Sequence, residues 1–168
     1  MTKQTQYVLD TNILVHCVRE GRLWASIRED YQLLLIEPTP IVSAVTSGEL
    51  RSLALQFRWG TAKLERMEFV LGYFVEIPVE SGRVVTTYAT IDAHFQVRGQ
   101  PMGKNDLWIA ATAVASDATL LTTDRDFDRL DPLFLTREWI HLSSEPKARG
   151  KARRIAGPLG FDPHSQFT

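Results

Sequence analysis

The feature that most constrains the fold is a repeated alternation of short apolar segments with longer segments of helical periodicity. The first apolar segment, residues 7–9, ends at Asp10, and a helical pattern follows at once. A later apolar segment ends in the same way at Asp124. Strands that alternate with helices form a parallel sheet that is covered by helices on both faces. The alternation therefore predicts an α/β fold in three layers, α/β/α, with a mostly parallel central sheet.

Periodicity, helix caps and breaking residues set the boundaries of the expected elements. Strands are expected over residues 7–9, 32–36, 73–77, 119–123 and 139–142. Helices are expected over residues 13–20, 23–30, 43–58, 61–72, 81–97 and 107–116, and Asn105 is the expected cap of the last helix. Ligands of such sheets bind beyond the carboxyl ends of the strands. The residues that follow the strands are therefore the first candidates for a functional site.

Length and composition limit the class of protein. A chain of 168 residues is enough for one domain with one core. The formal net charge of −1 excludes an overall basic field, so any binding to nucleic acid has to come from local charge. The single cysteine, Cys17, cannot form an internal disulfide, and no apolar run reaches the ~18 residues of a membrane span. We therefore expect a cytoplasmic protein that does not contact the membrane.

Four acidic residues stand out by their positions. Asp10 and Asp124 end strands, Glu49 lies within a helix, and Asp106 lies near the start of another helix. Taken singly, each fits a structural role as a helix cap, a solvated charge or a turn residue. Gathered at one rim of the sheet, they would repel one another unless a cation lay among them, and oxygen ligands suit Mg²⁺ or Mn²⁺. Such a site can activate water for displacement at phosphorus. Spacing alone does not decide between the two interpretations.

Four motifs extend this pattern over most of the chain. In order they are LDTNILV at residues 9–15, SAVTSGEL at 43–50, NDLWIAATA at 105–113 and LLTTDRDF at 120–127. In this order and spacing they resemble the PIN-domain family, and most of all its VapC-type toxin branch. The resemblance implies a PIN-like nuclease domain over residues 1–143. It also implies an endoribonuclease that hydrolyses RNA phosphodiester bonds with metal-activated water and without a covalent enzyme intermediate.

The resemblance also implies roles for individual residues. The four acids would be catalytic and metal-binding, with Asp10 and Asp106 as the main ligands of Mg²⁺ or Mn²⁺. Glu49 and Asp124 would complete the acidic pocket by holding a second metal or orienting water. Supporting roles fall to three nearby residues, Asn12, Thr122 and Asp126; for Asp126 a solvated loop charge is the alternative.

The implied partners are an RNA substrate, a small antitoxin protein and a second copy of the chain in a homodimer. One alternative is a catalytically inactive PIN-like module that binds RNA or protein. Such modules typically lose one or more of the acids, whereas all four are present here. Another alternative is a phosphatase of the haloacid dehalogenase type, which needs a second aspartate two residues after the first. Asn12 occupies that position and argues against a phosphatase.

Residues 144–168 follow the last motif and form a basic tail that we expect to be flexible. Its basic side chains cluster at five positions, Lys147, Arg149, Lys151, Arg153 and Arg154. The cluster is either simply solvated or contacts RNA or a protein partner.

Overall fold

The computed structural model describes residues 5–141, so the basic cluster at residues 147–154 lies outside the described residues. Within residues 5–141 the chain forms five strands and six α-helices. In chain order they are β1 (Tyr7–Leu9), α1 (Thr11–Arg19), α2 (Arg22–Tyr31), β2 (Ile41–Ser43), α3 (Ala44–Gln56), α4 (Thr61–Tyr73), β3 (Val75–Ile77), α5 (Gly82–Val97), α6 (Lys104–Ala115), β4 (Thr119–Thr122), a 3-10 helix η1 (Asp126–Arg129) and β5 (Arg137–Trp139).

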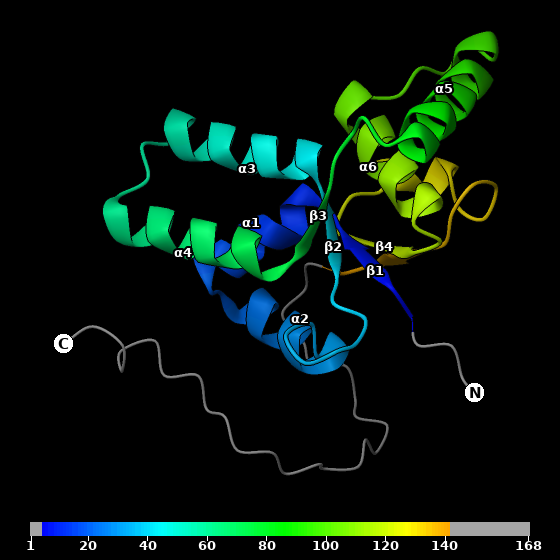
Figure 1. Ribbon diagram of the computed structural model, residues 1–168. Helices are drawn as coiled ribbons and strands as arrows, with labels where there is room; N and C mark the ends of the chain where they lie inside the picture. The colour runs from blue at the N-terminus through cyan, green and yellow to red at the C-terminus, as the bar shows by residue number, and fades with distance from the viewer. Residues whose placement is uncertain (1–4, 142–168) are drawn as a thin grey trace.

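The five strands form one sheet in the order β3-β2-β1-β4-β5, and every pairing is parallel (Figure 1). This confirms the expected α/β class. The chain moves outward from β1 to β2 and β3, and then returns to β4 on the other side of β1. The neighbours β1 and β4 therefore flank the point where the strand order reverses. In open parallel sheets this point opens a crevice beyond the carboxyl ends of the strands.

Helices cover both faces of the sheet, because successive side chains of a strand point to opposite faces. In β1, Leu9 packs in the core formed with α1–α4, whereas Val8 packs in the core formed with α5 and α6. In β4, Leu121 and Leu120 divide between the two cores in the same way. Figure 1 shows α1, α3 and α4 on one side of the sheet and α5 and α6 on the other. The three-layer α/β/α arrangement is confirmed.

The strand expected over residues 32–36 is wrong, because this segment is a turn. The carbonyl of Gln32 accepts hydrogen bonds from the backbone of Leu35 at 2.7 Å and of Ile36 at 2.9 Å. Leu33 is fully buried, but the side chain of Leu35 is 79% exposed. The apolar residues of this segment do not form a strand; one of them, Leu33, anchors the turn in the core. The second strand is instead β2, only three residues long, which begins just after Pro40.

Two other expected boundaries also shift. Asn105 does not cap α6, because the helix begins at Lys104 with Gly103 as its N-cap residue. The last expected strand, 139–142, is β5 at Arg137–Trp139, and residue 142 lies outside the described residues. Within residues 5–141, no helix is long and apolar enough to cross a membrane.

Candidate active site

Asp10 lies at the carboxyl end of β1, where its extended backbone makes it the N-cap residue of α1. Its Oδ1 accepts a hydrogen bond from the backbone N–H of Thr11 at 2.7 Å. Its Oδ2 accepts one from the hydroxyl of Thr122, the last residue of β4, also at 2.7 Å. Only 4% of Asp10 is exposed to solvent. One bond from the start of α1 and one from the end of β4 therefore fix this carboxylate.

Thr122 also connects Asp10 to Asp124. The Thr122 hydroxyl oxygen accepts a hydrogen bond from the backbone N–H of Asp124 at 2.9 Å. Asp124 Oδ1 in turn accepts from the backbone N–H of Asp126 at 2.8 Å. The side chain of Asp126 is exposed and does not line the pocket described below. Thr122 therefore orders both strand-end aspartates, whereas Asp126 supports the site through its backbone.

Glu49 comes from α3, and residues of two other helices hold its carboxylate. The Thr11 hydroxyl of α1 donates to Glu49 Oε2 at 2.5 Å, and the Asn105 amide of α6 donates to Oε1 at 2.7 Å. The Asn105–Glu49 bond joins residues 56 positions apart in the sequence. The bonds bring α1, α3 and α6 together at the crevice and orient Glu49.

Asp106 lies in the first turn of α6 and is half-buried. Gly103 lies directly against it, since a Cβ atom built on Gly103 would be 2.6 Å from Asp106 Oδ2. Real Cβ atoms do not approach so closely, so any other residue at position 103 would force the carboxylate to move. Glycine at the helix start therefore makes the space that Asp106 occupies.

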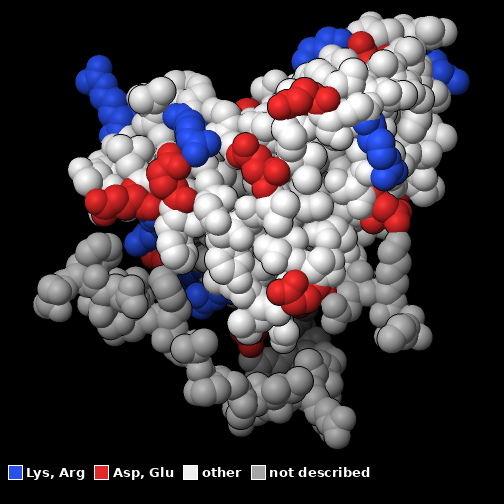
Figure 2. All heavy atoms as spheres, viewed as in Figure 1, with Lys and Arg blue, Asp and Glu red and all other residues white. Residues whose placement is uncertain are grey.

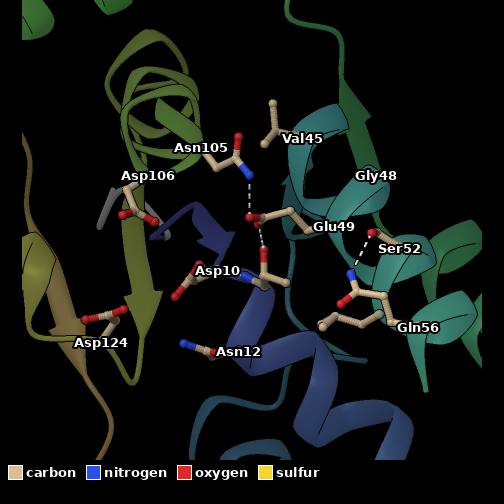
Figure 3. A pocket seen from close by; sticks show the side chains of 12 residues that line it. Asp10, Asn12, Val45, Gly48, Glu49, Ser52, Gln56, Asn105, Asp106 and Asp124 are labelled. Carbon is tan, nitrogen blue, oxygen red and sulfur yellow. Dashed lines mark hydrogen bonds between the residues drawn. The ribbon is translucent and has the colours of Figure 1, made fainter. Parts of the chain in front are cut away.

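The four carboxylates line one pocket with a volume of about 620 Å³. Figure 3 shows Asp10, Asp106 and Asp124 around the same space, with Glu49 on its α3 side and Asn12 at its α1 edge. The remaining lining residues come from α1, α3 and α6: Thr11, Val45, Gly48, Ser52, Leu53, Gln56 and Asn105. The crevice at the reversal of strand order is thus an acidic pocket.

Burial and the charges of neighbouring carboxylates make two of the acids, Asp10 and Asp106, costly to ionise. Burial, with smaller effects from the charges of Asp106 and Asp124, raises the pKa of Asp10 to about 7, although bonds from Thr122 and Thr11 oppose the rise. Burial followed by the charges of Asp124, Glu49 and Asp126 raises the pKa of Asp106 to about 6. A cation between the carboxylates would lower both pKa values again.

No side chain of the described residues supplies that cation, because no Lys, Arg or His lines the pocket. Arg125 follows Asp124 in sequence, but its guanidinium lies over the Trp139 ring at 4.0 Å and close to Asp128 at 3.7 Å. On the face seen in Figure 2, acidic and basic side chains are interspersed, and no broad basic surface is present. The pocket is therefore locally anionic without an internal counter-ion.

The donor set fits a hydrated divalent cation. Within residues 5–141, no three His, Cys, Asp or Glu side chains are close enough to enclose a metal ion by themselves. Mg²⁺ does not need such an enclosure, because it usually binds one or two carboxylates and keeps several waters. Carboxylate oxygens are also the ligands that Mg²⁺ and Mn²⁺ favour. An open pocket of about 620 Å³ leaves room for those waters.

Sequence reasoning missed three contributors to the site. Asn105 is expected only as a helix cap, yet its amide and the hydroxyl of Thr11 hold Glu49. Gly103 received no role, although it makes room for Asp106. The proximity of Asn105 to Asp106 in the NDLWIAATA motif was a signal for Asn105. Thr11 likewise stands beside Asp10 in the LDTNILV motif, but its bond to Glu49 depends on the packing of α1 against α3. Gly103 lies three residues before Asp106, and its role depends on the conformation at the start of α6.

An acidic pocket at the reversal point of an all-parallel sheet is typical of α/β enzymes that act on phosphodiesters with the help of a divalent metal. Residues 7–133 match the family model of the PIN domain, and the chain belongs to the PIN-domain family. Nucleases of this family are typically metal-dependent. The resemblance drawn from the four motifs is thereby confirmed at the level of the family.

Individual relatives give the same result. Ribonuclease VapC2 of Rickettsia felis is 28% identical over 130 residues, which cover 77% of this chain and 95% of the relative. A crystal structure of VapBC2 from Rickettsia felis, bound to a DNA fragment of its promoter, superposes with a TM-score of 0.71 at 24% identity and covers 82% of this chain and 100% of that one.

VapBC-5 of Mycobacterium tuberculosis, from the VapBC family of toxin–antitoxin systems, superposes with a TM-score of 0.59 at 27% identity. It covers 82% of this chain and 99% of that one. Within the PIN-domain family, the chain is thus similar to VapC-type ribonucleases, as its motifs predicted.

Proposed function

We propose that this protein is a metal-dependent endoribonuclease and the toxin of a VapBC-type toxin–antitoxin pair. The observation that carries the proposal is the pocket at the ends of β1 and β4, which four carboxylates line without a basic side chain among the lining residues. Similarity to a VapC ribonuclease over 130 residues supports RNA as the substrate. The proposed location is the cytoplasm, whose reducing conditions suit a chain with a single cysteine.

Asp10 and Asp106 are the proposed main ligands of Mg²⁺ or Mn²⁺, with Glu49 and Asp124 completing the acidic pocket. A bound cation would supply charge stabilisation at the phosphate and a more acidic water for hydrolysis. Other side chains of the protein orient the acidic residues. Thr122 holds Asp10, while Thr11 and Asn105 hold Glu49 in place.

An inactive PIN-like binding module is the alternative. A module that no longer cleaves RNA has no need to keep buried carboxylates with raised pKa values, because they reduce the stability of the fold. Here all four acids line the same pocket, and two of them are held by side-chain hydrogen bonds. These observations favour the active enzyme.

An antitoxin is the proposed protein partner, since the structure of VapBC-5 to which the chain is similar comes from a toxin–antitoxin system. Expression of the chain alone should arrest bacterial growth, and co-expression of a neighbouring antitoxin gene should restore it. We also expect the toxin to form a two-fold homodimer. The basic cluster at residues 147–154 should strengthen RNA binding at low salt only, because contacts to phosphate weaken as salt rises.

Cleavage of structured RNA by the purified protein tests the proposed function. Cleavage should require Mg²⁺ or Mn²⁺ and stop on addition of a chelator. Asp106→Asn removes one charge at nearly constant shape, so the variant should fold and lose most of the activity. Asp30→Asn, a change on the exposed surface of α2, is the matched control and should cleave normally. Full activity in chelator or in Asp106→Asn would rule out the proposed site.

A further inference from the structure

The acidic pocket continues beyond the carboxylates along one face of α3. The residues of α3 that line it share helical spacing, at intervals of three or four positions; they are Val45, Gly48, Glu49, Ser52, Leu53 and Gln56. Between Glu49 and Gln56 this face extends about 10 Å, at 1.5 Å per residue. That length is enough for roughly three stacked nucleotides at 3.4 Å each. The α3 face is therefore long enough to hold a strand whose phosphate lies at the acids.

The chemistry of the α3 face suits bases and riboses better than phosphates. Beyond Glu49 its lining side chains are uncharged: Ser52 and Gln56 are polar, and Leu53 is apolar. The lining lacks the Arg and Lys side chains that attract phosphates most strongly, and the nearby carboxylates repel them. Bases are read by hydrogen bonds and apolar contacts to their edges, which this lining offers. Unpaired bases offer their edges to such contacts, which is how proteins usually recognise RNA sequence.

Ser52 and Gln56 are already arranged for this role. Gln56 Nε2 donates a hydrogen bond to Ser52 Oγ at 2.9 Å, and Figure 3 shows the two side chains side by side along the pocket. In this pairing the Ser52 hydroxyl keeps its hydrogen, and the Gln56 amide keeps Oε1 as an acceptor. The pair can therefore offer one donor and one acceptor to a base edge or a 2′-hydroxyl.

Gly48 leaves the α3 face open next to Glu49. A Cβ atom built on Gly48 would have no atom within 4 Å, so packing does not demand glycine here. Glycine inside a helix is less favourable than alanine by about 1 kcal/mol. The missing side chain instead widens the pocket at the junction between the acids and the uncharged face.

We propose that the α3 face formed by Gly48, Ser52 and Gln56 is a nucleoside subsite that binds an unpaired base next to the cleaved phosphate and sets the base preference there. The inference rests on the proposed ribonuclease function. It commits to single-stranded or loop RNA as the occupant, because the face is continuous with the carboxylates and its lining is uncharged.

A cleavage assay on RNA hairpins with randomised loops, read by sequencing, tests the subsite. Gln56→Leu keeps the size of the side chain and removes its amide. We expect the base preference at one position beside the cut to fall roughly ten-fold, with KM raised and kcat at saturating RNA retained. The matched control is Gln96→Leu on α5, where Gln96 donates to Asp92 across the same helical interval at 3.3 Å. This control should cleave with the wild-type preference.

Gly48→Ala provides a second test, because its effect on RNA binding and its effect on the stability of the fold are expected to have opposite consequences. It should raise the melting temperature and also raise KM, whereas a glycine needed only for the fold would lower the melting temperature. Equal base preference and equal KM in Gln56→Leu and Gln96→Leu would overturn the subsite.

A measurement of RNA binding tests the subsite independently of the proposed ribonuclease activity. Fluorescence anisotropy with the same RNA pool, measured in Asp106→Asn protein, does not need cleavage. If Gln56→Leu weakens RNA binding and Gln96→Leu does not, the subsite is supported, even when the wild-type protein cleaves no RNA. In that case only the proposed ribonuclease activity fails. Binding that neither substitution changes would contradict the subsite.

Discussion

Replacing Asp10 by asparagine removes a buried charge at nearly constant size and so separates the electrostatic effect of the carboxylate from its role as a helix cap. Burial, helped by the charges of Asp106 and Asp124, raises the pKa of Asp10 from 3.8 to about 7. The folded protein therefore binds this proton more tightly than the unfolded chain does. Between these two pKa values the free energy of unfolding falls as the pH rises, and it stays lowered above them. The total loss is on the order of 4 kcal/mol, at about 1.4 kcal/mol per pH unit.

Asparagine avoids this loss but gives up one hydrogen bond. Asp10 accepts from the Thr11 backbone and from the Thr122 hydroxyl through two oxygens, and asparagine has one acceptor oxygen. The missing bond costs about 1–2 kcal/mol. At pH 8 the metal-free variant should therefore be more stable by roughly 2 kcal/mol, which raises Tm by roughly 4–8 °C. At pH 5 the wild type has lost only about 1.7 kcal/mol, at about 1.4 kcal/mol for each pH unit above 3.8, so the two proteins should then differ in stability by less than about 1 kcal/mol.

Thermal unfolding followed by circular dichroism in chelator, at pH 5 and pH 8, measures how this difference in stability changes with pH. Added Mn²⁺ should raise Tm of the wild type at pH 8 and leave Asp10→Asn unchanged, because only a bound ligand stabilises the fold. Asp30→Asn, on the exposed face of α2, should behave as the wild type at both pH values. If Asp10→Asn is destabilised equally at pH 5 and pH 8, Asp10 acts only as a helix cap and the electrostatic reasoning is refuted.

Three other substitutions test two supports of the site and one buried hydroxyl elsewhere on α3. Gly103→Ala should displace Asp106, whose Oδ2 would be 2.6 Å from the new Cβ, and lower kcat by about 10–100-fold with little change in Tm; normal kcat would contradict this. Thr122→Val removes the donor to Asp10 and should weaken Mn²⁺ binding, measured by calorimetry, by about 10–100-fold. Thr46→Val replaces a buried hydroxyl that has no hydrogen-bond partner among the described residues. It should raise Tm by roughly 2–4 °C without changing cleavage, and a lower Tm would show that the hydroxyl is satisfied.

Strand-end residues were the part of the site that the sequence could predict. Asp10 and Asp124 follow β1 and β4, and a parallel sheet places the ends of its strands on one edge. Their adjacency was not predictable, because it depends on the strand order β3-β2-β1-β4-β5. Glu49 and Asp106 came from motifs within helices. Only the packing of α3 and α6 brings both of them to the same pocket.

The two errors have different physical causes: residues 32–36 form a local turn, whereas Asn105 has a side-chain partner that is distant in sequence. Leu33 made residues 32–36 appear to be a buried strand, yet the segment turns because only this leucine is fully buried. Asn105 has a good residue type for a helix cap. Its amide instead binds Glu49, and the helix starts one residue earlier.

Mn²⁺ binding measured by electron paramagnetic resonance tests the central claim most directly, since it reports the cation without depending on any RNA. The wild type at pH 8 should bind Mn²⁺ at the pocket, and Mg²⁺ should compete with it. Asp10→Asn and Asp106→Asn should each weaken binding at least ten-fold, whereas Asp30→Asn should not. Binding of equal strength in all four proteins would contradict the assignment of the acidic pocket as a metal site.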